Sequence, residues 1–471
     1  MLVSQLFDCA DFSREIKDKE IKNITDNSLY CSEGSVFICR NSGEKYVKEA
    51  LDKGAVLVVA EKKLCENCYV TDDVAGEYAR LSAEFFGNSH KRLRLIAVTG
   101  TNGKTTTANM LYTILTLSGK KCGLIGTVKS NICGEENESA LSTPDPYEMH
   151  GMFSRLCQWG AEYCIIEASS QGISEGRLAG LEFYLTVLTN ISQDHLDYHG
   201  TMENYIESKK SIFALSEKSI INADDEKSQE FIGNSKGKVI TYSLSKNEAD
   251  YIAKSIKLRE DGSDYAVIAD YAIHRIKLNV PGEFNIMNSL AAVAAGVECD
   301  VSLEFCAYAL KNFSGVKGRM EIVDTSAEYK VIIDYAHTPD AMKKVLLCLN
   351  SFPHNRIITV FGCGGERDKD KRAQMGDVAL QLSDIVIVTS DNPRGEDPTV
   401  IIDDILSGMK KSKKSIYIHE NRRKAIEYAL KIAEKNDIIL LAGKGHETYQ
   451  LIGEDKIPMD ERQIVREFLS K

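Results

Sequence analysis

The stretch of the sequence that carries the clearest chemistry is a glycine loop, VTGTNGKTTTANM, at residues 98–110. The usual phosphate-binding loop has the spacing G-x-x-x-x-G-K-[ST]. Here Val98 stands where the first glycine is expected, and a glycine follows at Gly100. An apolar segment that predicts a strand enters the loop, and a segment that predicts a helix leaves it. Backbone N–H groups in such a turn surround an anion at the positive end of the helix dipole.

The remaining residues of this loop fit a nucleotide site. Glycines let the backbone approach a phosphate closely, a lysine reaches the outer phosphates, and a hydroxyl can bind Mg²⁺. A strand–turn–helix with an incidental lysine is the alternative, but the strand, both glycines, the lysine and the threonines all agree with nucleotide binding. The predicted nucleotide-binding residues of the loop are Gly100, Thr101, Asn102, Gly103, Lys104, Thr105 and Thr106.

A second group of residues could hold a metal ion beside the loop. The predicted strand 163–166 places Glu167 at its carboxyl end, and the next predicted strand runs into TNISQDHLDYHG at 189–200, which contains His195. In a parallel sheet, neighbouring strands end at the same edge, so both side chains can reach Mg²⁺ near the loop. The alternative is that both residues only cap loops.

Composition excludes several classes of protein. The formal net charge of -11 argues against a general nucleic-acid binder, which presents a basic face. The first residues lack a basic and an apolar region of the signal-peptide kind, and no apolar run reaches the roughly 20 residues of a membrane span. We therefore expect a cytoplasmic protein with reduced thiols, no membrane insertion and a monomeric state. A zinc site at Cys65 and Cys68 would need a second cysteine pair at a readable spacing, and none is present.

Strand and helix patterns alternate along three blocks, which predicts parallel α/β sheets. Strands are expected at 35–39 and 55–59 with a helix at 46–53, then at 93–99, 162–167 and 183–189 with a helix running to about 118. The third block has strands at 330–334, 356–361, 384–389 and 437–442. The predicted domains are residues 1–90, 91–317 and 318–471, and ligands are expected at the carboxyl ends of their strands.

The compact loop TGTNGKTT resembles that of the Mur ligase family, which builds the peptide of peptidoglycan, and of its folylpolyglutamate synthetase relatives. The resemblance implies the three-domain Mur ligase architecture. An N-terminal domain then binds UDP-MurNAc, a central P-loop parallel-sheet domain binds ATP, and a C-terminal Rossmann-like domain binds the amino acid.

The same resemblance implies two Mg²⁺ ions, held by Thr105, Glu167, His195 and a fourth ligand. The fourth is Lys209, nine residues after Gly200, where the matching lysine of the family is carbamylated by CO₂. A cation would repel Mg²⁺, whereas a carbamate supplies an anionic oxygen. From the residues alone, Lys209 and Lys210 read as two solvated lysines on a polar helix.

Three further residues are assigned to ATP by resemblance. Asn288 in PGEFNIMN opens an apolar helix at 286–297 and is expected near adenine, while Asp334 and His337 are expected near ATP where the second and third domains meet. An asparagine can pair donor and acceptor with an adenine edge. The alternative for Asn285 and Asn288 is an N-terminal helix cap.

Four motifs of the third block resemble the family members that add the third residue of the peptide: DYAHTPDAM at 334–342, FGCGGERDKDKR at 361–372, DNPRGEDP at 391–398 and AGKGHETYQ at 442–450. In the family DNPR goes with meso-diaminopimelate, whose distal carboxylate an arginine can hold with two parallel hydrogen bonds. That role falls to Arg394, with a surface turn residue as the alternative. The predicted amino-acid contacts are Arg367, Asp391, Asn392, Pro393, Arg394, Gly443 and Glu447.

For the nucleotide–dipeptide substrate, the resemblance points to Ser28, Ser142, Thr143, Ser169 and Arg177. Arg177 is expected to pair with the D-glutamate or its surroundings. Four positions depart from the family pattern: Gln171 replaces the common His, Glu175 the usual Gln, and Asn27 and Leu29 the Asp and Arg of a D-S-R signature.

The implied activity is an ATP-dependent ligase that joins meso-diaminopimelate to UDP-MurNAc-L-Ala-D-Glu through an acyl phosphate, with Lys104, Glu167, His195 and Lys209 as the catalytic residues. Phosphoryl transfer of this kind needs positioning and charge neutralisation more than covalent help. The alternatives are a lysine-adding ligase, a folylpolyglutamate synthetase, or a nucleotide-binding protein without catalysis.

Overall fold

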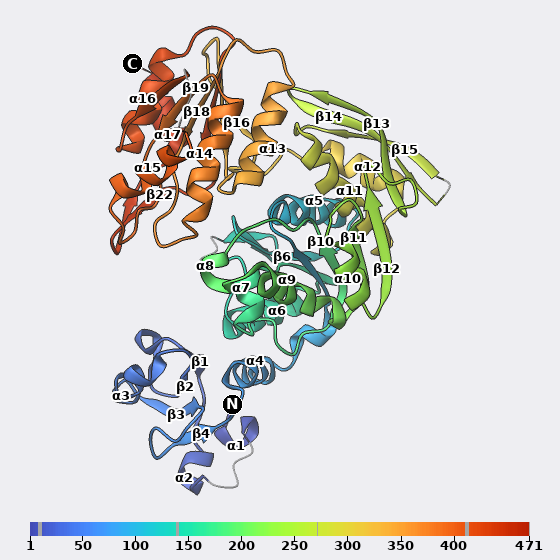
Figure 1. Cartoon of the computed structure of the whole chain (residues 1–471). Coiled ribbons are helices and arrows are strands. Elements are labelled where there is room, and N and C mark those ends of the chain that lie inside the picture. The colour runs from blue at the N-terminus through green and yellow to red at the C-terminus, as the bar shows by residue number, and fades with distance from the viewer. Residues whose placement is uncertain (8–11, 138–140, 271, 410–413, 471) are drawn as a thin grey trace.

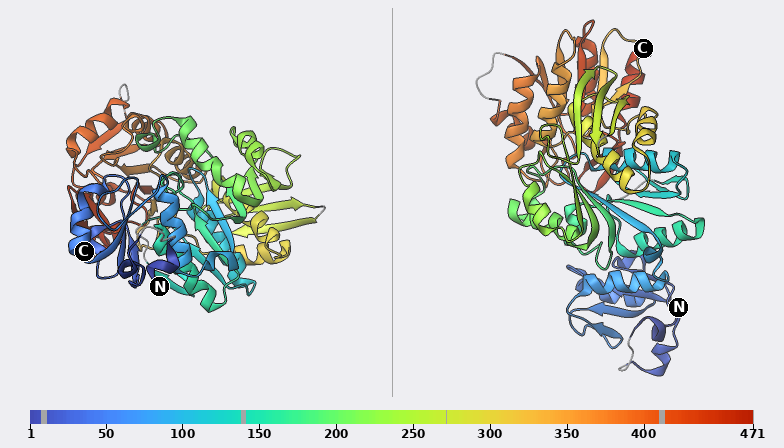
Figure 2. Two further views of the ribbon diagram at one scale, coloured as in Figure 1. Left: turned by 90° about the horizontal axis from the view of Figure 1, so that it is seen from below. Right: turned by 90° about the vertical axis from the view of Figure 1, so that its right-hand side faces the viewer.

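The chain folds into three sheet-based units that follow one another along its length, as a computed structural model shows (Figures 1 and 2). The structure describes residues 1–7, 12–137, 141–270, 272–409 and 414–470. Figure 1 shows the first unit at one end, the central unit in the middle and the third unit at the other end. Each sheet lies within one of the predicted domains, whose boundaries stay predictions.

The first unit is a small parallel sheet in the order β1-β2-β3-β4. Its second and third strands are almost fully buried because apolar residues fill both faces. Its elements are α1 (Val3–Leu6), α2 (Arg14–Lys17), β1 (Asn23–Thr25), β2 (Ser35–Ile38), α3 (Val47–Asp52), β3 (Ala55–Ala60), β4 (Cys68–Val70) and α4 (Val74–Phe85).

The central unit contains an 11-stranded sheet in the order β15-β14-β13-β12-β11-β10-β5-β9-β6-β7-β8. The glycine loop follows β5, which pairs in parallel with β9 on one side and β10 on the other. The strands are β5 (Arg94–Thr99), β6 (Cys122–Ile125), β7 (Ser130–Ile132), β8 (Glu135–Asn137), β9 (Tyr163–Glu167), β10 (Phe183–Leu188), β11 (Ser216–Asn222), β12 (Lys238–Ser243), β13 (Tyr251–Arg259), β14 (Gly262–Ala269) and β15 (Ala272–Leu278).

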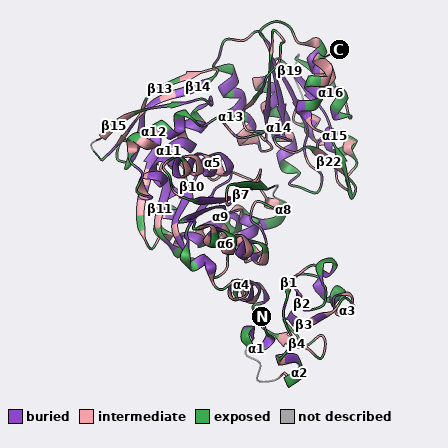
Figure 3. Ribbon diagram, turned by 180° about the vertical axis from the view of Figure 1, so that it is seen from behind, coloured by how far each residue is buried: buried purple, intermediate pink, exposed green. Residues whose placement is uncertain are grey.

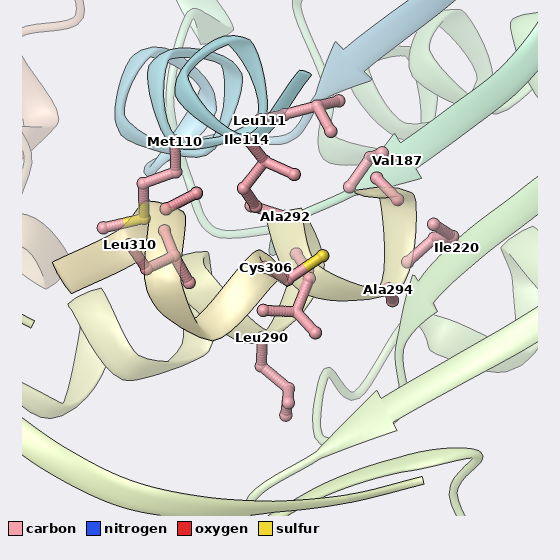
Figure 4. Packing of buried hydrophobic residues seen from close by; sticks show 14 of the residues in the cluster. Met110, Leu111, Ile114, Val187, Ile220, Leu290, Ala292, Ala294, Cys306 and Leu310 are labelled. Carbon is pink, nitrogen blue, oxygen red and sulfur yellow. The ribbon is translucent and has the colours of Figure 1, made fainter. Parts of the chain in front are cut away.

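Helices cover this sheet, and one of them, α5, begins directly after the glycine loop. They are α5 (Lys104–Leu117), α6 (Pro146–Trp159), α7 (Ser170–Ser174), α8 (Leu196–His199), α9 (Met202–Ser211), α10 (Ser228–Asn234), α11 (Glu283–Glu298) and α12 (Leu303–Lys311). Helix α11 is apolar nearly all round and is buried between α5 and the sheet, as the purple ribbon in Figure 3 shows. Figure 4 shows Leu111 and Ile114 of α5 in the same cluster as Leu290 of α11.

The third unit is a six-stranded sheet in the order β16-β17-β21-β18-β19-β20, parallel except at β16. Its strands are β16 (Glu321–Val323), β17 (Lys330–Asp334), β18 (Ile357–Phe361), β19 (Ile385–Val388), β20 (Ser415–Ile418) and β21 (Ile438–Ala442). The hairpin β22 (Tyr449–Ile452) and β23 (Asp455–Pro458) follows, and the helices are α13 (Pro339–Asn350), α14 (Asp370–Leu382), α15 (Pro398–Ser407), α16 (Arg422–Ile432) and α17 (Glu461–Leu469).

The expected α/β class and each predicted strand are present, with ends that differ by at most one residue. The cysteines that the structure describes are all free thiols, including Cys65 and Cys68. Within the same residues, no helix is both long and apolar enough to cross a bilayer.

The α5–α11 core leads to a stability prediction. Replacing Leu111, which is fully buried, with alanine leaves a cavity and should lower the free energy of unfolding by about 2–5 kcal/mol. The matched change Leu117→Ala lies on the same helix at a side chain that is 47% exposed, and it should stay within about 0.5 kcal/mol. Urea titration followed by the fluorescence of the single tryptophan, Trp159, measures both, and equal losses would contradict this packing.

Candidate active site

The glycine loop is closed so tightly that its two central glycines cannot be replaced without a shift. Gly100 has a φ of 138°, and an added Cβ would lie 2.0 Å from the Oγ1 of Thr189. Gly103 has a φ of 87°, and its Cβ would lie 2.3 Å from the Oδ1 of Asn288. A side chain at either position would therefore collide with a neighbouring residue, which agrees with the tight turn of a phosphate-binding loop.

Lys104 is the first residue of α5, and its ammonium lies over the loop. It donates hydrogen bonds of 2.9 Å to the carbonyls of Gly100 and Thr101. Desolvation lowers the pKa of Lys104, and Arg319 lowers it further, while Glu167 and Asp194 act in the opposite direction. A partly buried cation held mainly by carbonyl oxygens is ready to accept an anion.

Thr105 and Glu167 form the strongest candidate for a metal site. The Thr105 hydroxyl donates to a Glu167 carboxylate oxygen at 2.7 Å, and the same carboxylate accepts from the hydroxyl and the backbone N–H of Thr127. Across the residues that the structure describes, no three His, Cys, Asp or Glu side chains converge to enclose a metal. Two oxygen ligands beside a phosphate site fit Mg²⁺, which is usually held by few protein groups together with substrate phosphates.

Lys209 is buried, in contrast to the solvated lysine that its polar helix suggested. Its Nζ donates to the carbonyl of Gly100 at 2.9 Å and lies 4.7 Å from the centre of the Tyr205 ring. Burial and the nearby ammonium of Lys104 hold the pKa of Lys209 well below its usual value. Lys210, the next residue, turns outward and pairs with Glu207.

A buried carboxylate, Asp194, lies among two histidines and one lysine where the central and third units meet. Its oxygens lie 3.4 Å from Nε2 of His195, 3.6 Å from Nε2 of His337 and 3.8 Å from Nζ of Lys371. Burial alone would raise the pKa of Asp194, but the hydrogen bond from His337 and the proximity of His195 and Lys371 hold it well below its usual value.

His195 keeps 42% of its side chain exposed, yet the surrounding loop desolvates the ring and lowers its pKa to about 4. His337, Lys104 and Lys209 act in the same direction, against Asp194. The imidazole is therefore neutral at pH 7, the form that binds metals. The structure shows no direct contact between His195 and Glu167.

The third unit reaches the glycine loop through several side chains. Asn102 donates to Asp340 at 3.1 Å, and Gln193 donates to Asp368 at 3.2 Å. Arg319, which the sequence motifs did not single out, donates to the Thr105 hydroxyl at 3.3 Å. Its guanidinium also lies 4.5 Å from the centre of the Tyr335 ring. Arg319 therefore adds a positive charge to the phosphate side of the site.

The residues assigned to the rest of the nucleotide have mixed environments. Asn288 is buried against Gly103 and donates to Asn285, whose own amide caps the carbonyl of Pro281 at 2.8 Å. Asp334 is buried, which raises its pKa, and both of its oxygens accept backbone N–H groups, from Met320 and Ala336. Asp334 thus orders the turn that carries Arg319.

Four of the five residues predicted for the nucleotide–dipeptide lie in one network beside Glu167. Thr143 contacts the Glu167 carbonyl at 2.8 Å and the Ser169 hydroxyl at 2.9 Å, and Arg177 donates to the Thr143 carbonyl at 2.8 Å. Ser142 joins through a 2.8 Å hydrogen bond between its hydroxyl and that of Thr127, whose own proton goes to Glu167. Ser28 does not take part, because it lies in the first unit, where it donates to Glu49 at 2.9 Å.

Two departures from the family pattern touch each other. Gln171 donates to Glu175 at 2.9 Å, and Glu175 forms an ion pair with Arg177. Asp145 lies 3.4 Å from the same guanidinium. Arg177 therefore has part of its charge neutralised within the protein, which the sequence motif could not show.

The predicted amino-acid contacts meet at the carboxyl ends of β18, β19 and β21. Asn392 donates to Glu447 at 2.9 Å and accepts from the buried ammonium of Lys444 at 2.8 Å. Arg394 donates to the carbonyl of Gly365 at 2.8 Å, and its pKa is lowered by burial and by the neighbouring charge of Arg367.

Small residues and carbonyls pack closely at the same edge of the sheet. A Cβ at Gly443, where φ is 106°, would lie 2.7 Å from the Oδ2 of Asp391, and a Cβ at Gly365 would lie 1.9 Å from the carbonyl oxygen of Pro393. The charges of Arg367, Asp391 and Glu447 all act on the guanidinium of Arg394, so acidic and basic side chains lie near one another at this edge.

The chain is similar to known proteins in sequence and in fold. The family profile described as the Mur ligase middle domain matches residues 98–296, and the profile described as the Mur ligase, glutamate ligase domain matches residues 318–445. A UDP-N-acetylmuramoyl-L-alanyl-D-glutamate--2,6-diaminopimelate ligase of Clostridium acetobutylicum is 40% identical over 96% of this chain and 95% of its own length. A Caldanaerobacter subterraneus protein of the same name is 41% identical over 92% and 90%.

Solved structures give matches of the same kind. One titled as a UDP-N-acetylmuramoyl-L-alanyl-D-glutamate--2,6-diaminopimelate ligase superposes with a TM-score of 0.70, 31% identity and coverage of 100% of this chain and 99% of that chain. MurF ligase from Thermotoga maritima, in complex with ADP, gives a TM-score of 0.66 at 20% identity over 96% and 98%, which is a likeness of fold.

The closed glycine loop predicts that Gly100→Ala weakens ADP binding by about 10–100-fold, because its methyl group overlaps Thr189 and displacing it costs about 1–3 kcal/mol. Gly119→Ala is the matched control, since Gly119 has a φ of 87° but open space around it. Isothermal titration with ADP measures both variants, and equal affinities would contradict the role of the loop.

Proposed function

The chain belongs to the Mur ligase family, and from that premise we propose that it is the ATP-dependent ligase that joins meso-2,6-diaminopimelate to UDP-MurNAc-L-Ala-D-Glu during peptidoglycan precursor synthesis. One observation carries the proposal: relatives that are 36–41% identical over at least 92% of the chain bear the name of that enzyme. The arginine pair beside Glu447 supports the choice of amino acid.

The glycine loop is the proposed binding site of the ATP phosphates. Backbone N–H groups of the loop and the start of α5 face the anion, Lys104 lies over it, and Arg319 approaches from the third unit. Asn288, which is held against Gly103, is proposed to contact adenine, and His337 to lie near the nucleotide. Cations placed before the reaction begins stabilise the charge of the transferring phosphoryl group.

Activation of the D-glutamate side chain is the proposed first step. A γ-carboxylate oxygen attacks the γ-phosphorus of ATP, the bond to the bridging oxygen breaks, and an acyl phosphate and ADP result. Thr105, Glu167 and His195 are the proposed protein ligands of Mg²⁺, which neutralises phosphate charge when it is bound. Thr143 and Ser169, in contact with each other next to Glu167, are proposed to place the dipeptide at the γ-phosphate.

Lys209 is proposed to react with CO₂ before it acts as a metal ligand. Burial lowers the pKa of Lys209, which favours the unprotonated amine, and that nitrogen attacks the carbon of CO₂ and loses one proton. The product is a carbamate, which carries a negative charge where a protonated lysine would carry a positive one. This exchange supplies an anionic oxygen beside Lys104, whose ammonium balances it.

Amide formation is the proposed second step. The amine of diaminopimelate attacks the acyl carbon, and phosphate leaves with one oxygen of the original carboxylate. Arg367 and Arg394 are proposed to hold carboxylates of the amino acid, while Asp391 and Glu447 face its ammonium groups. Lysine lacks the distal carboxylate, so Arg394 would have no carboxylate of the substrate to pair with.

The amino-acid pocket predicts a specific product and its loss in one variant. With UDP-MurNAc-L-Ala-D-Glu and ATP, the protein should join diaminopimelate and leave lysine largely unreacted, as mass spectrometry of the product shows. Arg394→Ala should lower kcat/KM for diaminopimelate by about 10–100-fold, since a charged hydrogen bond contributes about 1.5–3 kcal/mol.

The control for this experiment is Arg423→Ala, which removes a half-exposed arginine from α16 of the same unit. ATP affinity should stay within about twofold in both variants. A wild-type protein that prefers lysine would reject the proposed substrate. An Arg394→Ala variant with an unchanged rate would reject the role of that residue.

Carbamylation predicts that activity depends on CO₂ and on one of two adjacent lysines. Protein assayed in CO₂-depleted buffer should lose activity and regain it with bicarbonate. Lys209→Ala should lose about 10–100-fold or more, because a metal ligand is missing. Lys210→Ala, on the outer side of the same helix, should keep its activity. Equal activities of the two variants would contradict the proposal.

A further inference from the structure

A fully buried arginine, Arg372, lies behind the two loops that form the amino-acid pocket. It belongs to α14, and its side chain has no exposed surface. One loop follows β18 and carries Arg367, and the other follows β19 and carries Arg394. None of the roles assigned above uses Arg372, although a buried guanidinium is costly unless it is paired and hydrogen-bonded.

The guanidinium of Arg372 holds both loops at once. Its two terminal nitrogens donate to the two carboxylate oxygens of Glu396 at 3.0 Å each, which is the bidentate arrangement. Nη2 also donates to the carbonyl of Gly364 at 3.2 Å, and Nη1 donates to Asp404 of α15 at 2.9 Å. Gly364 belongs to the first loop and Glu396 to the second, so one side chain connects them.

Glu396 completes the connection from the other side. Besides Arg372, its carboxylate accepts the backbone N–H of Glu366, which lies in the first loop next to Arg367. The hydrogen bonds from Arg372 lower the pKa of Glu396 to about 2, in agreement with a carboxylate that stays ionised in this pair. Arg372 and Glu396 therefore form a clamp, which we name the Arg372–Glu396 clamp.

The clamp controls where the guanidinium of Arg394 lies. The backbone N–H of Gly365 donates to the carbonyl of Asn392 at 2.9 Å, and Nη1 of Arg394 donates to the carbonyl of Gly365 at 2.8 Å. A Cβ at Gly364 would lie 3.0 Å from the same Nη1. Arg394 is thus seated against the first loop, and a shift between the loops would move it.

We propose that Arg372 is the positioning residue of the amino-acid pocket, which sets the separation of Arg367 and Arg394 and so selects a substrate with two carboxylates. The inference rests on the proposed function and extends it to a residue that does not touch the substrate. Bidentate recognition of a carboxylate tolerates little displacement, and a misplacement of about 1 Å can lower a rate by about 100-fold. A longer gap between the loops would weaken binding of the distal carboxylate of the substrate and leave the ATP site unaltered.

The test compares Arg372→Lys, Arg372→Met and Glu396→Gln with a matched pair, Arg356→Lys and Arg356→Met. Arg356 forms hydrogen bonds of 3.1 and 2.6 Å to the buried Asp437 at the amino end of the same sheet, away from the pocket. Both arginines are tied to carboxylates of the third unit, so loss of stability should be similar. Steady-state kinetics with diaminopimelate, lysine and ATP, together with thermal unfolding, are measured for each variant.

We expect kcat/KM for diaminopimelate to fall by about 10–100-fold in the Arg372 variants, mainly through KM, with KM for ATP within about twofold. The preference for diaminopimelate over lysine should fall as well. Arg372→Lys should not restore it, because an ammonium cannot form the two-sided contact. Glu396→Gln should act in the same direction, and the Arg372→Met/Glu396→Gln double variant should lose less than the sum of the two changes.

Two outcomes would overturn the inference. If the Arg372 and Arg356 variants lose activity in proportion to their stability, with the amino-acid preference intact, Arg372 is only structural. If Glu396→Gln keeps wild-type KM for diaminopimelate, the clamp does not set the pocket. A wild-type protein that fails to join diaminopimelate would instead reject the proposed function itself, so the two failures are distinguishable.

Discussion

The structure depends on basic side chains that are packed around one glycine loop. Nζ of Lys104 and Nζ of Lys209 both donate to the Gly100 carbonyl, and Arg319 approaches the loop from the third unit. The carboxylates of Glu167 and Asp194 favour the charged form of Lys104. Desolvated charges cost several kcal/mol each when they are not paired. A polyanionic ligand at this loop relieves that cost, and the lowered pKa values of both lysines follow from the same constraint.

The constraint also explains why the third unit contacts the loop. Asp340 and Asp368 accept hydrogen bonds from Asn102 and Gln193 of the central unit, and His337 and Lys371 lie around Asp194. Reactive phosphate chemistry needs water to be excluded, and these contacts bring the amino-acid pocket towards the phosphate site. The glycine loop and the pocket are built on separate sheets, so contact between the two units is what allows one reaction to use both.

The fold class and the motifs could be predicted from the sequence because both follow from local patterns of residues. The strand 94–99, the glycines that need positive φ and the DNPR loop each follow from short patterns with a physical cause. The antiparallel strands β13–β15 lie outside the predicted elements, although their alternating exposure is a pattern that periodicity can reveal.

Residues whose role comes from partners far away in the sequence could not be predicted from local patterns. The role of Asp194 comes from its contacts with His337 and Lys371, which follow it by more than 140 positions. The role of Arg372 comes from its contact with Glu396, in the loop after the next strand. A polar helix also predicts an exposed lysine at Lys209, because periodicity does not show which lysine packs under the glycine loop. For Arg319, the sequence offers only the glycines of the preceding turn, Gly315 and Gly318, as an indication of a special position.

The central claim is that ATP activates the D-glutamate γ-carboxylate, and transfer of oxygen tests it most directly. UDP-MurNAc-L-Ala-D-Glu labelled with ¹⁸O in that carboxylate is joined to diaminopimelate, and the inorganic phosphate released is weighed. The account predicts one ¹⁸O in the phosphate for each amide bond formed, because the leaving group carries a carboxylate oxygen. Phosphate free of the label, with the amide still formed, would contradict it.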